Sequence, residues 1–91
     1  MNKIIVIGSG LGGLATALRL SQDSKNQITI LEKAETAGGR LNIINKDGFM
    51  FDMGPSFMSM TYELDELFGS IGEEVPVEMV ELEPLYQVFF E

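Results

Sequence analysis

The chain has 91 residues, which suits one small domain, and its 45% hydrophobic and 22% charged residues are typical of a globular protein. It contains neither cysteine nor histidine, which excludes disulfides, thiolate nucleophiles, the usual zinc ligand sets and imidazole acid–base catalysis. Its six bases all lie in residues 1–46, whereas residues 47–91 hold eleven of the fourteen acids. The net charge of −8 argues against nucleic acid, or an anionic membrane bound by charge alone, as a partner.

The first 32 residues alternate between apolar runs and a helical pattern. Residues 3–7 form a β-branched run that is typical of a strand buried on both faces, and residues 28–31 form a second apolar run. Between them, residues 14–20 carry apolar side chains at helical spacing. This order predicts a right-handed βαβ unit of two parallel strands and one helix.

A glycine-rich turn joins the first predicted strand to the helix. Gly8 permits a tight turn, Gly10 lets the backbone approach a pyrophosphate, and Gly13 lets the helix pack closely on the sheet. The helix would then direct its free N–H groups and the positive end of its dipole at the phosphates. The candidate phosphate-binding residues are Gly8, Ser9, Gly10, Leu11, Gly12 and Gly13.

Two further polar features follow the second predicted strand. Glu32 lies 22 positions after Gly10, near the spacing of about 20 expected for an acid that binds a ribose diol. Such a carboxylate would repel a 2′-phosphate, so the pattern favours NAD or FAD; the alternative is a solvated glutamate. The segment Gly38-Gly39-Arg40 offers close backbone approach and a guanidinium for phosphate oxygens. Its alternative is a flexible loop with a surface arginine.

The middle of the chain is predicted to form a hairpin. Strand-like residues 41–44 and 49–51 flank an Asp-Gly pair, which is a strong hairpin signal. Methionine and phenylalanine gather in residues 49–60. We interpret this cluster first as packed core, with a path for a long apolar substrate as the alternative.

The remaining residues are predicted to form a helix and two strands. Residues 61–71 have amphipathic spacing, and Gly72 stands where a helix cap would. Residues 75–83 and 86–90 look like strands separated by proline. Since the last strand has nothing after it to pair with, we expect the chain to be the front piece of a longer polypeptide.

These motifs occur in a fixed order along the chain. The glycine-rich turn is followed by Glu32, by Gly38-Gly39-Arg40 and by the sequence from Asp47 to Ser56, which includes Asp52-Met53-Gly54-Pro55-Ser56. The combined pattern resembles the flavin-dependent amine oxidase and desaturase superfamily. Within it, the pattern is similar to bacterial-type phytoene desaturases, including the dehydrosqualene and diaponeurosporene enzymes.

This resemblance implies a cofactor, a substrate and site residues. The cofactor would be FAD, and the reaction would remove hydrogen across a carbon–carbon bond of an apolar polyene, with hydride passing to the flavin. Gly8 to Gly13 would hold the pyrophosphate, Glu32 would bind the adenosine ribose and Arg40 would lie along the phosphates. The implied cofactor-binding set is completed by Lys33, Gly39, Gly54, Pro55 and Ser56, the last three bordering the isoalloxazine.

We therefore expect an α/β fold: the N-terminal portion of a Rossmann-like FAD-binding domain, with a βαβ unit, a hairpin and a helix. Residues 1–74 would form the partial nucleotide-binding domain, and residues 75–91 would begin a substrate domain. The 91 residues alone are expected to be inactive. The alternatives are an NAD-dependent dehydrogenase domain and a non-enzymatic remnant. We expect a cytoplasmic protein, with peripheral membrane contact through regions outside this chain left open.

Overall fold

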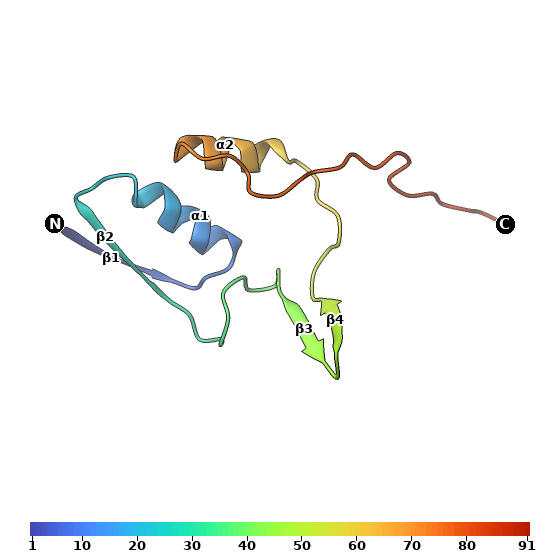
Figure 1. The fold of residues 1–91 in the computed structure, drawn as a ribbon, viewed down its shortest axis with the longest axis horizontal. Helices are drawn as coiled ribbons and strands as arrows, with labels where there is room; N and C mark the ends of the chain where they lie inside the picture. Colours follow the sequence, from blue (N-terminus) through green and yellow to red (C-terminus); the bar gives the residue numbers. More distant parts are fainter.

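The computed structural model describes residues 1–91 and begins with the predicted βαβ unit (Figure 1). Strand β1 (Asn2–Ile7) and strand β2 (Asn26–Leu31) pair in parallel, and helix α1 (Leu11–Leu20) connects them. The β-branched and aliphatic residues of both strands suit a parallel pair, which needs such a crossover helix. The predicted strand–helix–strand order is confirmed.

Helix α1 begins one turn earlier than its apolar spacing predicts, at Leu11 rather than Leu14. Gly12 and Gly13 therefore belong to the first helical turn, where glycine weakens the sequence signal for a helix. A β-carbon on Gly13 would overlap the carbonyl oxygen of Gly8. Glycine is therefore required at this position because the helix packs directly against the preceding turn.

The predicted hairpin is confirmed as a second, separate sheet. Strand β3 (Ile43–Lys46) pairs antiparallel with strand β4 (Phe49–Asp52). The two turn residues, Asp47 and Gly48, have φ values of 51° and 81°. Positive φ at both positions is what a two-residue type I′ turn needs, and Asp-Gly tolerates it well.

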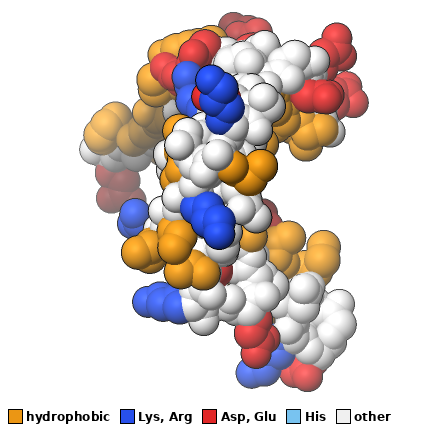
Figure 2. All heavy atoms as spheres, turned by 90° about the vertical axis from the view of Figure 1, so that its left-hand side faces the viewer, with side chains coloured by type: hydrophobic (Ala, Val, Ile, Leu, Met, Phe, Trp, Pro, Cys, Tyr) orange, Lys and Arg blue, Asp and Glu red, His pale blue; other side chains and the backbone are white.

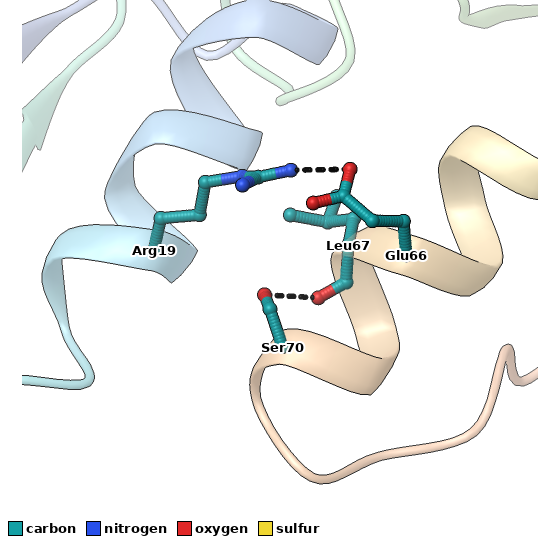
Figure 3. Close-up of polar contacts among 4 residues, drawn as sticks. All are labelled: Arg19, Glu66, Leu67 and Ser70. Atoms are coloured by element: carbon teal, nitrogen blue, oxygen red, sulfur yellow. Dashed lines mark hydrogen bonds and ion pairs between the residues drawn. The ribbon is translucent and has the colours of Figure 1, made fainter.

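Helix α2 (Tyr62–Ser70) lies against α1 and is followed by Gly72 at a φ of 74°. The helix and its glycine are as predicted. Figure 3 shows the contact: the side chain of Leu67 points toward α1, and Arg19 donates a hydrogen bond of 2.9 Å to Glu66. Leu67 is buried, whereas the side chains of this ion pair are 50% and 59% exposed.

Replacing Leu67 by alanine should therefore release α2 from α1, because truncating a buried leucine costs about 2–5 kcal/mol. The variant Arg19→Ala removes only an exposed ion pair, whose contribution is about 1 kcal/mol or less. Hydrogen exchange of the α2 amides measures the difference. Protection should fall strongly in Leu67→Ala and little in Arg19→Ala, and equal losses would contradict the assignment of the contact to Leu67.

The core of the chain is small. Only Ser9, Ala17 and Leu67 are buried, and the accessible surface is 8127 Å², against roughly 5,200 Å² for a compact protein of this mass. The radius of gyration is 17.0 Å, against about 12 Å for a compact domain of this length. Figure 2 shows hydrophobic side chains at the surface in several separate places. The chain is therefore open, with very few packed side chains around its turns.

Helix α1 covers only one face of the β1–β2 sheet. On the opposite face Ile5, Ile7 and Leu31 remain 63%, 86% and 51% exposed. Their register explains this, because Ile5 pairs with Thr29 and Ile7 with Leu31, so all four share the face away from the helix.

Neither α1 nor α2 has the length and apolar character that crossing a membrane requires.

The prediction of strands at residues 75–83 and 86–90 is wrong. Residues 71–91 contain no helix or strand, and the segment turns back past α2 before it extends to the C-terminus (Figure 1). A strand needs a neighbour for its backbone groups, and no strand lies beside this segment. Five glutamates in residues 73–83 add like-charge repulsion. The domain boundary predicted after residue 74 stays a prediction.

Candidate functional site

The glycine-rich turn lies where β1 ends and α1 begins. Gly8 has a φ of 95°, which favours glycine, and Gly10 precedes the helix with extended backbone. A β-carbon on Gly10 would meet no atom within 4 Å, so the space in front of this backbone is open. The first turn of α1 has no acidic residue, and the first N–H groups of a helix have no partner within it. The turn therefore fits an anionic group such as a diphosphate.

Glu32 directly follows β2, and its carboxylate faces the glycine-rich turn. Its Oε2 accepts hydrogen bonds from the Ser9 backbone N–H at 2.7 Å and from the Ser9 hydroxyl at 2.6 Å. Its Oε1 accepts a third from the backbone N–H of Ala34 at 3.0 Å. Parallel strands bring the ends of β1 and β2 to the same edge of the sheet, which is why residues 23 positions apart meet.

These donors lower the pKa of Glu32 from 4.5 to about 2, with the Ser9 hydroxyl as the largest cause, followed by the N–H groups of Ala34 and Ser9. Hydrogen bonds to the charged form of a carboxylate favour that form. Glu32 is therefore ionised at neutral pH. An ionised carboxylate accepts hydrogen bonds from hydroxyl groups and repels phosphate.

The lowered pKa of Glu32 predicts a specific acid sensitivity. Because the folded pKa lies below the unfolded value of 4.5, the interaction stabilises the fold above pH 4.5 and is lost as the pH falls toward 2. Urea unfolding across this range should show a steeper loss of stability in the wild type than in Glu32→Gln. Equal slopes in the two proteins would contradict the assignment.

The loop of residues 38–40 lies directly on the glycine-rich turn. The backbone N–H of Gly38 donates to the carbonyl oxygen of Ser9 at 2.8 Å. Gly39 has a φ of 60°, and a β-carbon there would lie 3.1 Å from the Cα of Gly10. The close backbone approach predicted for the two glycines is thus made to the turn itself. Arg40 is exposed and forms no ion pair.

The turn containing Gly54 packs against the same loop, at Arg40. A β-carbon on Gly54 would lie 3.1 Å from the carbonyl oxygen of Arg40. The backbone N–H of Met53 donates to the carbonyl oxygen of Asn42 at 2.8 Å. A hollow of about 270 Å³ is lined there by Leu41, Asn42, Ile43, Asp52, Gly54, Pro55 and Ser56.

The structure thus brings three predicted site segments into contact, each with the next along the chain. The turn at Gly10 contacts the loop at Gly39, and the loop at Arg40 contacts the turn at Gly54. Lys33 is exposed beside Glu32 and its side chain takes part in no ion pair. Sequence reasoning missed Ala34, whose N–H reaches the carboxylate two residues before it. The sequence carries no clear signal for this bond, because the side chains known to bond their own backbone two residues on are chiefly the shorter Asn and Asp.

The interpretation of the methionine and phenylalanine cluster as packed core is wrong. Phe49, Met50, Phe51 and Met53 are all more than half exposed. Both faces of the β3–β4 hairpin are open, because a two-stranded sheet with no layer packed on it cannot bury its side chains. The phenyl rings of Phe49 and Phe51 lie 6.5 Å apart.

Comparison with known proteins shows what the chain resembles. Residues 6–70 match the family model of the NAD(P)-binding Rossmann-like domain. The chain is 41% identical to 4,4'-diapolycopene oxygenase of Methylomonas sp, over 98% of this chain and 18% of the relative. It is 42% identical to phytoene desaturase of Fusarium fujikuroi, over 97% of this chain and 16% of the relative.

A third relative, 4,4'-diapophytoene desaturase (4,4'-diaponeurosporene-forming) of Staphylococcus aureus strain Newman, is 41% identical over 98% of this chain and 18% of its own length. The resemblance to carotenoid desaturases inferred from the motifs is confirmed. The chain spans less than a fifth of the length of each of these relatives.

Proposed function

We propose that the dinucleotide of this chain, which belongs to the NAD(P)-binding Rossmann-like domain family, is FAD. Residues 1–56 would hold it within an oxidoreductase that acts on apolar polyenes. The observation that carries this proposal is the ionised Glu32 carboxylate held against the glycine-rich turn. A diphosphate on the turn would bring the attached ribose to this carboxylate. Both features fit the adenosine diphosphate half of the cofactor.

The choice of FAD over NAD is supported by the chain's path after β2. A simple NAD-binding fold would continue with a further helix and parallel strand. Here the chain instead forms the loop at Gly39 and a separate antiparallel hairpin, β3–β4. The names of the relatives describe desaturation and oxygenation, which are oxidative reactions that need a redox cofactor such as FAD.

The chain's residues would divide the cofactor between them. The backbone of Gly8 to Gly13 would bind the pyrophosphate, and Glu32 the adenosine ribose. Arg40 would neutralise phosphate oxygens, with Lys33 and Gly39 beside them. Gly54, Pro55 and Ser56, which line the hollow of about 270 Å³, would border the isoalloxazine.

The reaction itself belongs to the cofactor, which when bound would accept a hydride from a carbon–carbon bond. The residues of this chain bind and orient it. An oxygenase and two desaturases are about equally similar to the chain, so their shared sequence encodes something that both reactions need. Cofactor binding is such a feature. We propose that the 91 residues catalyse no desaturation alone, because they enclose no cavity for a long polyene.

Fluorescence anisotropy of FAD, measured with the 91-residue chain, tests the proposal. We expect saturable binding, displacement by ADP-ribose, and little displacement by the 2′-phosphate form of ADP-ribose. NAD carries the same ADP-ribose group and should displace FAD no better than ADP-ribose does. Binding of NAD with no binding of FAD would support a dehydrogenase domain instead, and binding of neither would support a non-enzymatic remnant.

A further inference from the structure

Ser9 is the one buried polar residue of the chain, with 3% of its surface exposed. All three of its polar groups are used, and they join three segments. Its N–H and its hydroxyl both donate to Oε2 of Glu32. Its carbonyl oxygen accepts from Gly38. Sequence reasoning placed Ser9 in the phosphate-binding turn and gave no role to its side chain.

The hydrogen bonds to Glu32 leave one acceptor position of its carboxylate free. An ionised carboxylate has about four acceptor positions, two on each oxygen. Both Ser9 donors converge on Oε2, and Ala34 takes one position on Oε1. The remaining position is on Oε1, and the backbone N–H of Lys33, the smallest of the contributions that lower the Glu32 pKa, is the one other protein donor near the carboxylate.

We propose that Ser9 is a positioning residue whose hydroxyl locks the Glu32 carboxylate so that Oε1 is presented to a ribose hydroxyl of the bound nucleotide. The inference rests on the proposed function and adds to it a residue that sets how tightly the ribose is recognised. Glutamate has three side-chain torsions, and holding them before binding reduces the entropy lost when the ribose arrives. Without the hydroxyl, the carboxylate would keep one donor on each oxygen, the N–H of Ser9 on Oε2 and the N–H of Ala34 on Oε1, and would be held less firmly on the side of Oε2.

The test replaces Ser9 by alanine, which removes the hydroxyl and keeps the backbone N–H. Thr16→Ala is the matched control, because Thr16 also loses a hydroxyl, here one that donates to the Gly12 carbonyl oxygen in α1 at 2.8 Å. The first readout is the pKa of Glu32, followed through its carboxyl carbon by NMR. Ser9→Ala should raise it by about one unit toward its usual value, and Thr16→Ala should leave it unchanged.

The second readout compares the affinities for ADP and for 2′,3′-dideoxy-ADP, which lacks both ribose hydroxyls. In Ser9→Ala the affinity for ADP should fall by up to about tenfold, the value of the charge-assisted hydrogen bond between Glu32 and the ribose that the hydroxyl helps to orient. The affinity for the dideoxy analogue should stay the same. A merely structural role of Ser9 would lower both affinities together.

Three results overturn the proposal in distinguishable ways. An unchanged Glu32 pKa in Ser9→Ala would show that the hydroxyl does not hold the carboxylate. Equal losses of ADP and dideoxy-ADP affinity would show that Ser9 supports the fold and not ribose recognition. Failure of the wild type to bind ADP at all would contradict the proposed function, and with it the ribose role of Ser9.

Discussion

Gly13→Ala is expected to abolish the ordered βαβ unit. The added β-carbon would overlap the carbonyl oxygen of Gly8 and lie 3.0 Å from the carbonyl carbon of the same residue. Both atoms are backbone, so no side-chain rotation can relieve the overlap, and α1 would have to move away from β1. Such overpacking costs about 3 kcal/mol or more. With only three buried residues, the chain has little stability to lose.

Gly12→Ala provides the control for this variant. Gly12 belongs to the same helical turn, but a β-carbon there would meet no atom within 4 Å. Alanine is favoured over glycine in a helix by about 1 kcal/mol, so Gly12→Ala should be as stable as the wild type or more stable. Circular dichroism during urea unfolding measures both variants. Similar stability of the two would contradict the close packing at Gly13.

Glu32→Gln is expected to lower the affinity for FAD by about tenfold or more, because a neutral amide forms weaker hydrogen bonds to ribose hydroxyls than a carboxylate. The amide would also present an N–H group where the carboxylate accepts from Ser9 or Ala34. The preference for FAD over ligands that carry a 2′-phosphate should also fall. Without the negative charge, the penalty against a 2′-phosphate is reduced, so FAD and the 2′-phosphate form of ADP-ribose should compete on more equal terms.

Glu35→Gln makes the same change of charge three residues away. Glu35 is exposed and forms no ion pair, so its replacement should leave the affinity for FAD and the selectivity unchanged. Anisotropy titrations of the two variants separate a local contact from a general effect of charge. If Glu35→Gln weakened binding as much as Glu32→Gln, the ribose contact would not be the cause.

The parts of the fold that could be predicted are those encoded by neighbouring residues. The Asp47-Gly48 pair specifies its own turn, since both residues adopt the positive φ that the turn requires. The apolar runs of β1 and β2 and the spacing within α2 are equally local. The start of α1 was missed because Gly12 and Gly13 disfavour helix on average, whereas here the packing against Gly8 decides.

The parts that could not be predicted depend on which segments meet in space. Residues 75–83 have strand-like composition, but a strand forms only where a neighbour supplies hydrogen bonds, and none does. The candidate site could likewise be predicted only in part from the sequence. The spacing of Glu32 from Gly10 identified the acid, but the three bonds that hold its carboxylate depend on side-chain torsions and on how β1 and β2 align.

The central claim is that the segment from Gly8 to Glu32 binds the adenosine diphosphate half of the dinucleotide. An NMR titration of the isotopically labelled chain with FAD tests it most directly, residue by residue. The account predicts saturable shifts of the amide signals from Gly8 to Gly13 and of Ala34, whose N–H is bound to Glu32. Shifts confined to the exposed β3–β4 hairpin, or no saturable shifts, would contradict it.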